Sequence, residues 1–336
     1  MNISCRQEDV KMMKRFSSLK KIRVTDPSVF VWVLLIAIII FSIFASPMFI
    51  RARNLRNVFL IQPVGLGIAS LGQAVIIISG GIDMSIGAAV SFLTSIAGGL
   101  YRDFPEIGVL PVMLIIAALG LLIGLVNGLL VVKLRIAPFM ATLATMSVIQ
   151  GGIFIYTKKT IGGIPKSFRF IAEGSIGPVP VCFLYFALIF VLVLILLNRA
   201  RYGRHLYAVG ANEWVSSITG IAVERVKLSA YLLGGLLTGL ASIFLAGRMG
   251  GGGPLVGKGY ELDTITAVVI GGVSLAGGEG NVAGAVGGVL ILAIFSNLMN
   301  LLDVNPYIQM LLKGLILITA VFFYSTKSTK AESQSV

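Results

Sequence analysis

Apolar runs long enough to cross a membrane recur along the whole chain, and they leave little room for any other kind of fold. Ten such runs are present, over 28–49, 60–79, 84–101, 108–132, 139–157, 181–198, 229–247, 263–276, 281–302 and 306–325. A helix needs about 20 apolar residues to cross the hydrocarbon core, where the backbone must satisfy its own hydrogen bonds. We therefore expect an all-α polytopic membrane protein with about ten transmembrane helices, some of them short or broken.

The charge content supports this class. Only 12% of the 336 residues are charged and the mean hydropathy is +0.96, whereas a soluble domain carries about 25% charged residues. The net charge of +13 lies mostly in short loops and termini, where it sets orientation and meets lipid headgroups. We expect membrane lipid, and no nucleic acid, as a partner of these basic residues.

The orientation follows from the amino-terminal tail. Seven Lys or Arg residues lie within 1–27, directly before the first apolar run, and basic segments stay on the cytoplasmic side. Ten crossings of 28–325 place the second tail, 326–336, on the same side. The run 263–276 is short and ends in glycines, so a segment that dips in and returns is the alternative there. The basic outer loops are expected to form short surface helices or docking edges, so their charge need not follow this rule.

Two glycine series repeat every four residues. They are Gly120, Gly124 and Gly128, and Gly280, Gly284 and Gly288. Small residues at this spacing let two helices approach closely. The sequence leaves two partners open, a helix of the same chain or a second copy of the chain.

One polar segment, Tyr202–Ile221, stands between two apolar runs. It is too polar to remain in a bilayer and too short to form a domain. Asn212 can cap a short helix over 212–218 and Gly220 can end it. We expect this helix to lie parallel to the membrane and to face the cytoplasm; an amphipathic helix resting on lipid headgroups is the alternative. His205 has no second metal ligand nearby, so no metal site is predicted.

Charged residues at the edges of apolar runs are the other candidates. Asp83 lies in the glycine-rich segment 80–87, where it can cap the next helix or face the transport path. Glu261 and Asp263 begin an apolar run, where a helix dipole favours carboxylates. Lys313 lies inside the last run and can reach the outer surface or pair with one of these three acids.

The sequence carries no motif for catalysis. Residues 252–259 nearly match the phosphate-binding pattern G-x-x-x-x-G-K-[ST], but Gly259 stands where a hydroxyl must hold magnesium. No catalytic triad, zinc motif or carboxylate pair accompanies it, and the two cysteines, Cys5 and Cys182, have no metal spacing. We expect a chain that is not an enzyme and holds no metal or cofactor of its own.

Four blocks together resemble the permease subunits of ribose-, xylose- and galactose-type ABC importers. The blocks are SGGIDMSIG at 79–87, GLVNGLLVVKLRIAPFMATLATM at 124–146, RYGRHLYAVGANEWVSSITGIAVERVKL at 201–228 and GYELDTITAVVIGGVSLAGGEGNVAGAVGG at 259–288. The ending at 305–321 looks similar too. The likeness covers most of 60–325 in the expected order.

The resemblance implies roles for particular residues. The loop 199–228 is similar to the coupling loop that contacts the ATPase in this family, through Gly203, Arg204, Tyr207, Gly210, Asn212, Glu213 and Gly220. The translocation path or its outer mouth is implied for Asp83, Asn127, Pro138, Thr142, Glu261 and Asp263. The family usually has two small residues after the coupling-helix glutamate, whereas Trp214 and Val215 follow Glu213 here.

The resemblance also implies an assembly. Its expected parts are this permease, a second permease subunit (the same chain or a paralogue), a separate ABC ATPase that uses ATP, and an extracytoplasmic solute-binding protein docking near 158–180 and 248–262. A sugar or related small polar solute would cross the cytoplasmic membrane by alternating access. The alternative from the residues is an ion-coupled secondary transporter, which needs broken helices and polar groups at the midplane.

Overall fold

The computed structural model describes residues 27–333, and the predicted basic tail with Cys5 lies almost wholly outside the described residues. The helices before the polar segment are α2 (Pro27–Ala45), α3 (Ala52–Arg56), the π-helical η1 (Asn57–Ile61), α4 (Pro63–Ile78), α5 (Ile86–Asp103), α6 (Val109–Val132), α7 (Pro138–Tyr156), α8 (Lys166–Glu173) and α9 (Val181–Asn198). Those that follow are α10 (Arg201–Ala211), α11 (Glu213–Ile218), α12 (Val223–Met249), α13 (Tyr260–Ile270), α14 (Val282–Leu301) and α15 (Pro306–Ser333).

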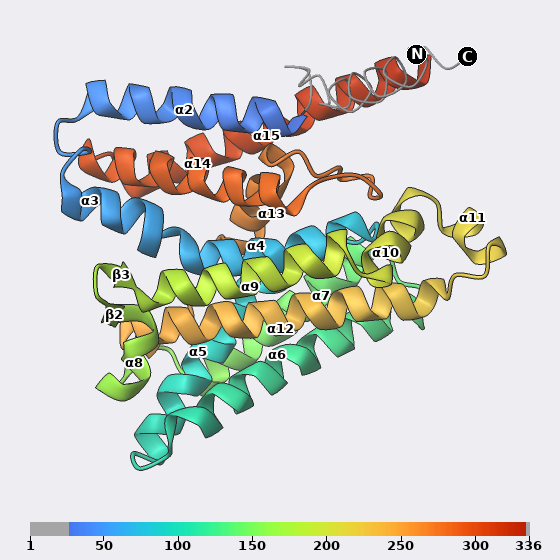
Figure 1. The fold of residues 1–336 in the computed structure, drawn as a ribbon. Coiled ribbons are helices and arrows are strands. Elements are labelled where there is room, and N and C mark those ends of the chain that lie inside the picture. The colour runs from blue at the N-terminus through green and yellow to red at the C-terminus, as the bar shows by residue number, and fades with distance from the viewer. Residues whose placement is uncertain (1–26, 334–336) are drawn as a thin grey trace, which may run out of the picture.

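Two short strand pairs lie at one end of the bundle. Antiparallel pairing joins β1 (Ile161–Gly162) to β4 (Gly251–Gly252), and β2 (Ser175–Ile176) to β3 (Val179–Pro180). The helices α3 and α8 lie at this same end, and α10 and α11 lie at the other (Figure 1). In our orientation the strand end is outside. The predicted short surface helix is present as α8 in the loop 158–180, whereas α3 is not a separate surface helix, because it continues through η1 into α4 as one long helix, Ala52–Ile78.

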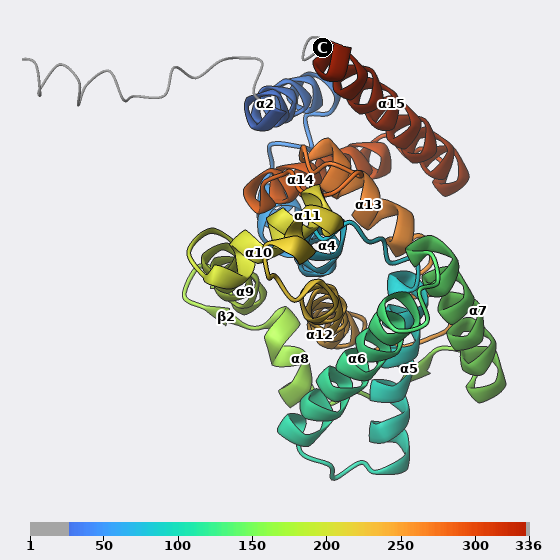
Figure 2. The same cartoon turned by 90° about the vertical axis from the view of Figure 1, so that its right-hand side faces the viewer.

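Helix α4 lies at the centre of the molecule. Seen along the bundle, α14, α12 and α9 surround it, while α2, α7 and α15 lie further out (Figure 2). Its side chains are mostly apolar, with Ser70 and Gln73 as the polar exceptions, and almost every residue of the helix is buried. A helix that is apolar on all faces is stable only when it is surrounded, so α4 forms the core of this fold.

The distribution of polarity is that of a membrane protein. Large apolar side chains are exposed on the outer helices, for example Ile155 at 90%, Leu188 at 61% and Leu114 at 60%. The buried polar side chains of the described residues are neutral with one exception, Asp83. Lipid accepts the exposed apolar faces, whereas backbone and side-chain polar groups must be satisfied inside.

Six of the described helices are long and apolar enough to cross a membrane. They are Ala52–Ile78, Val109–Val132, Pro138–Tyr156, Val181–Asn198, Val223–Met249 and Val282–Leu301. Two shorter apolar helices cover Val31–Ala45 and Pro306–Thr319. The structure is mainly helical and multi-pass, as expected; ten crossings with both termini in the cytoplasm stay a prediction.

The run 263–276 is not one spanning helix. Helix α13 has 11 residues, a length of about 16 Å at 1.5 Å per residue, against the roughly 30 Å of a hydrocarbon core. It is preceded by a non-helical segment and ends at Gly271. That segment starts at β4, beside Gly162, while the loop after α13 reaches Ile78 at the opposite end. The chain thus passes between the two ends through a broken element, because the glycines on both sides of α13 interrupt the helix.

Both glycine series pack inside this chain. A Cβ at Gly120 or Gly124 would overlap the backbone of α12 at Gly235, and Gly284 and Gly288 face the backbone of α13. The intrachain alternative is therefore confirmed for both series. The seam between α6 and α12 brings the two backbones into direct contact, as small residues allow.

Several helix boundaries differ from the predicted spans, most of all where the span predicted over 60–79 begins at Ala52. Helix α12 begins at Val223 rather than 229, because it continues out of the apolar run into the predicted loop 199–228. Helix α15 continues to Ser333, so the predicted tail 326–336 starts as helix. Charged and polar residues extend a helix readily once a buried stretch has nucleated it.

Candidate functional site

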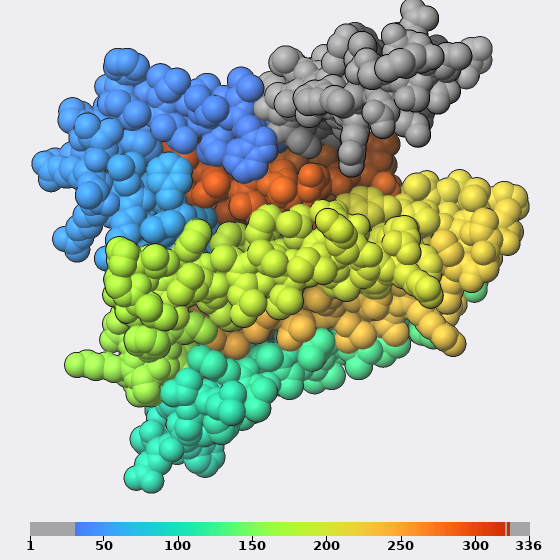
Figure 3. Space-filling view, viewed as in Figure 1, coloured from blue at the N-terminus to red at the C-terminus, as the bar shows by residue number. Residues whose placement is uncertain are grey.

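The polar segment folds as two helices rather than one. The predicted short helix is present as α11, but α10 precedes it over 11 residues. Both project from one end of the bundle between α9 and α12, as the yellow region of the space-filling view shows (Figure 3). In the predicted orientation, this end of the bundle faces the cytoplasm.

The predicted signals at the ends of α11 are confirmed. The Asn212 side chain accepts a hydrogen bond of 2.9 Å from the amide of Val215, which satisfies one free donor of the first turn. Gly220 follows the helix with φ +85°, a conformation that glycine adopts without strain. These two residues fix where the tip begins and where the chain turns back toward α12.

Helix α10 rests directly on two interior segments. Gly210 lies so close to the carbonyl of Ile78 and the amide of Gly278 that a Cβ there would overlap both. The Tyr207 hydroxyl donates a 2.9 Å hydrogen bond to the carbonyl oxygen of Gly280. The end of α4 and the loop 271–281 therefore both touch α10, and a displacement of α10 reaches them without an intermediary.

The tip of the element is apolar and exposed. Trp214 is 70% exposed and Ile218 is 63% exposed, which is unusual for a tryptophan unless a partner covers it. Glu213 pairs with Lys227 at the start of α12, with 2.5 Å between Oε1 and Nζ. Arg204 is exposed on α10, while Gly203 is buried against the carbonyl of Leu197 at the reversal from α9.

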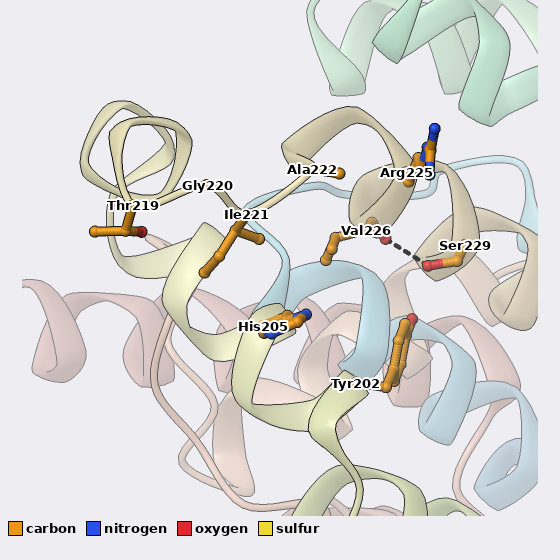
Figure 4. Close-up of a pocket in the computed structure, with 9 residues that line it drawn as sticks. All are labelled: Tyr202, His205, Thr219, Gly220, Ile221, Ala222, Arg225, Val226 and Ser229. Carbon is orange, nitrogen blue, oxygen red and sulfur yellow. Dashed lines mark hydrogen bonds between the residues drawn. The ribbon is translucent and has the colours of Figure 1, made fainter.

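A pocket of about 470 Å³ lies between α10 and the start of α12. Tyr202 and His205 line it from α10, while Arg225 and Ser229 line it from α12 (Figure 4). The Ser229 hydroxyl donates to the carbonyl of Val226 at 2.8 Å. Among residues 27–333, no group of three His, Cys, Asp or Glu side chains is placed to hold a metal ion. The pocket forms where the element joins the bundle.

Asp83 sits in a buried polar cluster between α4 and α5. Its Oδ1 accepts hydrogen bonds from the Ser85 amide at 2.7 Å and the Ser85 hydroxyl at 2.6 Å. The Asn127 amide group on α6 donates to the Ser85 hydroxyl at 2.8 Å and lies 3.4 Å from both Asp83 oxygens. The carboxylate thus caps the turn as the sequence suggested. Burial raises the pKa of this carboxyl, and the hydrogen bonds from Ser85 and Asn127 oppose that shift.

Two further helices close the same turn. On α7, the Thr142 hydroxyl accepts a 3.0 Å hydrogen bond from the Met84 amide and donates to the carbonyl of Pro138 at 2.9 Å. On α12, the Tyr231 hydroxyl donates to the carbonyl of Ile82 at 3.3 Å. Four of the predicted path residues, Asp83, Asn127, Pro138 and Thr142, therefore meet around one turn, where they hold four helices together.

The other two predicted residues lie elsewhere. Glu261 and Asp263 are in the first turn of α13, and the carboxylate of Glu261 lies against Gly87 in the first turn of α5. Asp263 pairs with Lys313 on α15 at 2.8 Å, with the two side chains 20% and 27% exposed. Of the alternatives for Lys313, the ion pair is the one the structure shows.

The segment 248–262 differs from the exposed loop that the sequence suggested. Gly251, Gly252, Gly253 and Pro254 are buried, because this glycine-rich backbone packs against α5 near Thr94. The exposed part is limited to side chains such as Leu255 and Lys258. The second suggested docking loop, 158–180, contains α8 and remains at the surface.

Three residues of the site were missed by sequence reasoning. Ser85, Tyr231 and Lys227 complete the contacts of Asp83, the 79–85 turn and Glu213. Ser85 had a local signal, since it lies two residues after an aspartate in a turn. Tyr231 and Lys227 had none, because their partners are distant in sequence.

Comparison with known proteins supports the resemblance. Residues 57–321 match the family described as branched-chain amino acid transport system, permease component. The chain belongs to this permease family. The ribose import permease of Bacillus subtilis is 39% identical over 301 residues, covering 88% of this chain and 91% of the relative. The galactose/methyl galactoside import permease of Escherichia coli K12 is 35% identical over 315 residues, covering 88% and 94%. No solved structure matches the chain.

Members of the family are permease subunits of importers. The two similar proteins are named as import permeases for ribose and for galactose or methyl galactoside. The chain spans almost the full length of these relatives. The resemblance to sugar-type ABC importer permeases, stated from four blocks, is thereby confirmed, as is its membrane character.

Proposed function

We propose that this chain is the membrane permease subunit of an ABC importer that carries a sugar or a related small polar solute across the cytoplasmic membrane. One observation carries the proposal: α10 and α11 form a projecting element whose exposed apolar tip is joined by backbone contacts to the interior. The tip suits contact with a separate ATPase, and the chain supplies the path rather than the energy. ATP is used by the partner.

Movement would reach the path through α10. When the ATPase closes around ATP and displaces α11, α10 presses on Ile78 at the end of α4 and on the loop after α13 through Gly210. The adjoining turn holds α5, α6, α7 and α12 together through the Asp83 cluster. These helices then tilt as rigid bodies, and the path opens alternately to each side.

The interior favours a neutral solute over an amino acid. Among the buried residues of the described chain, Asp83 alone is charged, and it is occupied by Ser85 and Asn127. The first turn of the half-helix α13 carries its own acids, Glu261 and Asp263. A broken helix that binds an amino acid presents a free amino-terminal end to the carboxylate, and here that end is already negative. A polyhydroxylated, uncharged solute fits this interior better.

The remaining partners follow from the surface. A loaded extracytoplasmic binding protein would dock at the strand end, on the loop 158–180 with α8. A second permease subunit would cover part of the apolar exterior, and lipid the remainder. Selectivity would be shared with the binding protein.

Purification from the native membrane in mild detergent, with mass spectrometry of the proteins that copurify, tests this proposal. We expect a separate ABC ATPase in amount equal to the permease. A preparation without an ATPase that still accumulates D-ribose or D-galactose in proteoliposomes under an ion gradient would instead support the secondary transporter. Rapid loss of uptake on adding a protonophore, with ATP maintained, would argue the same way.

A further inference from the structure

The central helix α4 carries two polar side chains that nothing described above explains. Gln73 is fully buried, and neither its carbonyl oxygen nor its amide nitrogen has a hydrogen-bond partner among the described residues. The hydroxyl of Ser70, one turn earlier, is likewise buried and unpaired. A buried amide without partners is costly and uncommon, so its retention at the centre of the fold calls for a partner in another state.

The two side chains share one face of α4. Leu66, Ser70 and Gln73 lie at positions i, i+4 and i+7, which fall on one stripe of a helix. Leu66 packs against the cluster formed by Ala267 of α13 with Val289 and Leu292 of α14. Gly72, on a different face, contacts α12. The face of α4 that carries Ser70 and Gln73 is therefore directed toward the broken element formed by α13. It is not directed toward the close contact between α4 and α12.

The helix on the far side of this stripe is the one best able to move away. Helix α13 is short and is flanked by glycine-rich, non-helical segments on both sides. The loop that follows α13 touches α10 at Gly210 and Tyr207. A displacement of α10 would therefore reach α13 through this loop, and any change in the spacing of α13 and α4 would alter the surroundings of Gln73.

The chemistry of an amide suits a sugar. Its carbonyl oxygen accepts two hydrogen bonds and its NH₂ group donates two, so it can bind two neighbouring hydroxyl groups, each of which donates and accepts. It does so without charge, as the neutral interior requires. A carboxylate would bind cations as well, and an aliphatic side chain would bind neither.

We propose that Gln73, with Ser70 beside it, is a solute-contacting group of the translocation path. The hydroxyl groups of the sugar would provide the hydrogen bonds that the Gln73 side chain lacks in this structure. This inference rests on the proposed function. It assigns a role to a residue that none of the four resembling blocks contains. Gln73 here is a binding residue, since the permease performs no chemistry on the solute.

Gln73→Leu separates this role from a structural one. Leucine removes an unpaired polar group at similar size, so the purified permease should unfold at the same or a higher temperature than the native chain. Uptake of D-ribose or D-galactose by the complete importer in membrane vesicles should fall roughly tenfold, the effect of about two lost hydrogen bonds. ATP hydrolysis stimulated by the loaded binding protein should persist.

Gln62→Leu is the matched control. Gln62 begins the same helix, but its amide nitrogen donates to the carbonyl of Ala293 at 3.3 Å. This variant should unfold at a lower temperature while the uptake per assembled importer stays within about twofold of the native value. Equal uptake by Gln73→Leu and the native chain would overturn the inference and leave the proposed function intact. A native permease that copurifies with no ABC ATPase would instead overturn the proposed function.

A second measurement covers the case in which Gln73→Leu does not assemble. Gln73→Cys, in a chain whose Cys5 and Cys182 are replaced by alanine, is treated with a membrane-impermeant thiol reagent in vesicles. We expect labelling that depends on ATP and decreases at least threefold when D-ribose and its binding protein are present. Absence of labelling in every nucleotide state, in a variant that still transports, would overturn the inference.

Discussion

The hydroxyl of Tyr207 on α10 donates a 2.9 Å hydrogen bond to the carbonyl oxygen of Gly280, which lies 73 residues further along the chain. It joins the projecting element to the loop between α13 and α14. This is a bond between a side chain and the backbone, so it can be removed without altering the loop itself.

Tyr207→Phe should weaken coupling. Loss of one partly buried hydrogen bond costs about 1 kcal/mol, or roughly fivefold in an equilibrium. We expect the number of solutes imported per ATP hydrolysed to fall by about that factor, while the permease inserts and assembles normally. Parallel measurement of uptake and phosphate release in proteoliposomes checks this. An unchanged ratio would show that the α10 contact with Gly280 carries no coupling.

Gly210→Ala should uncouple transport more severely. The added methyl group would overlap the carbonyl of Ile78 and the backbone of Gly278, and such overpacking typically costs about 1–3 kcal/mol. Gly151→Ala is the control, because nothing lies within 4 Å of a Cβ at that position. We expect transport to be lost in the first variant only. Normal uptake by Gly210→Ala would contradict the proposal that α10 transmits movement to the interior.

Glu213→Gln should alter coupling with little effect on stability. Its partner Lys227 is 13% exposed, but Glu213 itself is 52% exposed, and pairs screened by water contribute at most about 1 kcal/mol. The charge is placed beside the exposed tip, so its removal should weaken ATPase binding. The control is Glu224→Gln, whose pair with Lys133 is more than half exposed on both sides. Copurified ATPase per permease is the measurement, and equal recovery from both variants would contradict the prediction.

Asp83→Ala should destabilise the fold. The substitution leaves the amide and the hydroxyl of Ser85 without their acceptor inside the protein, at a cost of about 1–3 kcal/mol. Thermal unfolding of the detergent-purified permease measures it. Asp103→Ala is the control, because the Asp103 pair with Arg102 is about half exposed and such surface changes stay within about 0.5 kcal/mol. Equal unfolding temperatures would mean that the cluster contributes no net stability.

Lys313→Ala should be repaired by a second substitution. Asp263 is largely buried, so removing its partner leaves an unpaired carboxylate at a cost of roughly 1–3 kcal/mol after allowance for its partial exposure. In the double variant Lys313→Ala, Asp263→Ala neither charge remains, and stability should return toward the native value. A double variant no more stable than the single one would show that the two charges act separately.

Sequence patterns predicted the elements that depend on neighbouring residues. The apolar runs, the Asn212 cap, the Gly220 stop and the turn closed by Asp83 are all local. Helix α10 was missed because Gly203 and Gly210 lower its intrinsic propensity, while their close backbone contacts, which only the fold reveals, favour it. The pair between Asp263 and Lys313 was one of several that the spacing allowed. Gln73 had a signal, a lone amide inside an apolar run, whose meaning depends on burial.

The glycine seam between α6 and α12 restricts how the molecule can change shape. Two backbones in direct contact along Gly120, Gly124 and Gly235 leave no side chains to rearrange, so these helices cannot slide past each other without separating completely. Helices α6 and α12 should move together as one rigid unit in every stage of the transport cycle. Conformational change would then be concentrated in the opposite half, where the short helix α13 has non-helical segments on both sides.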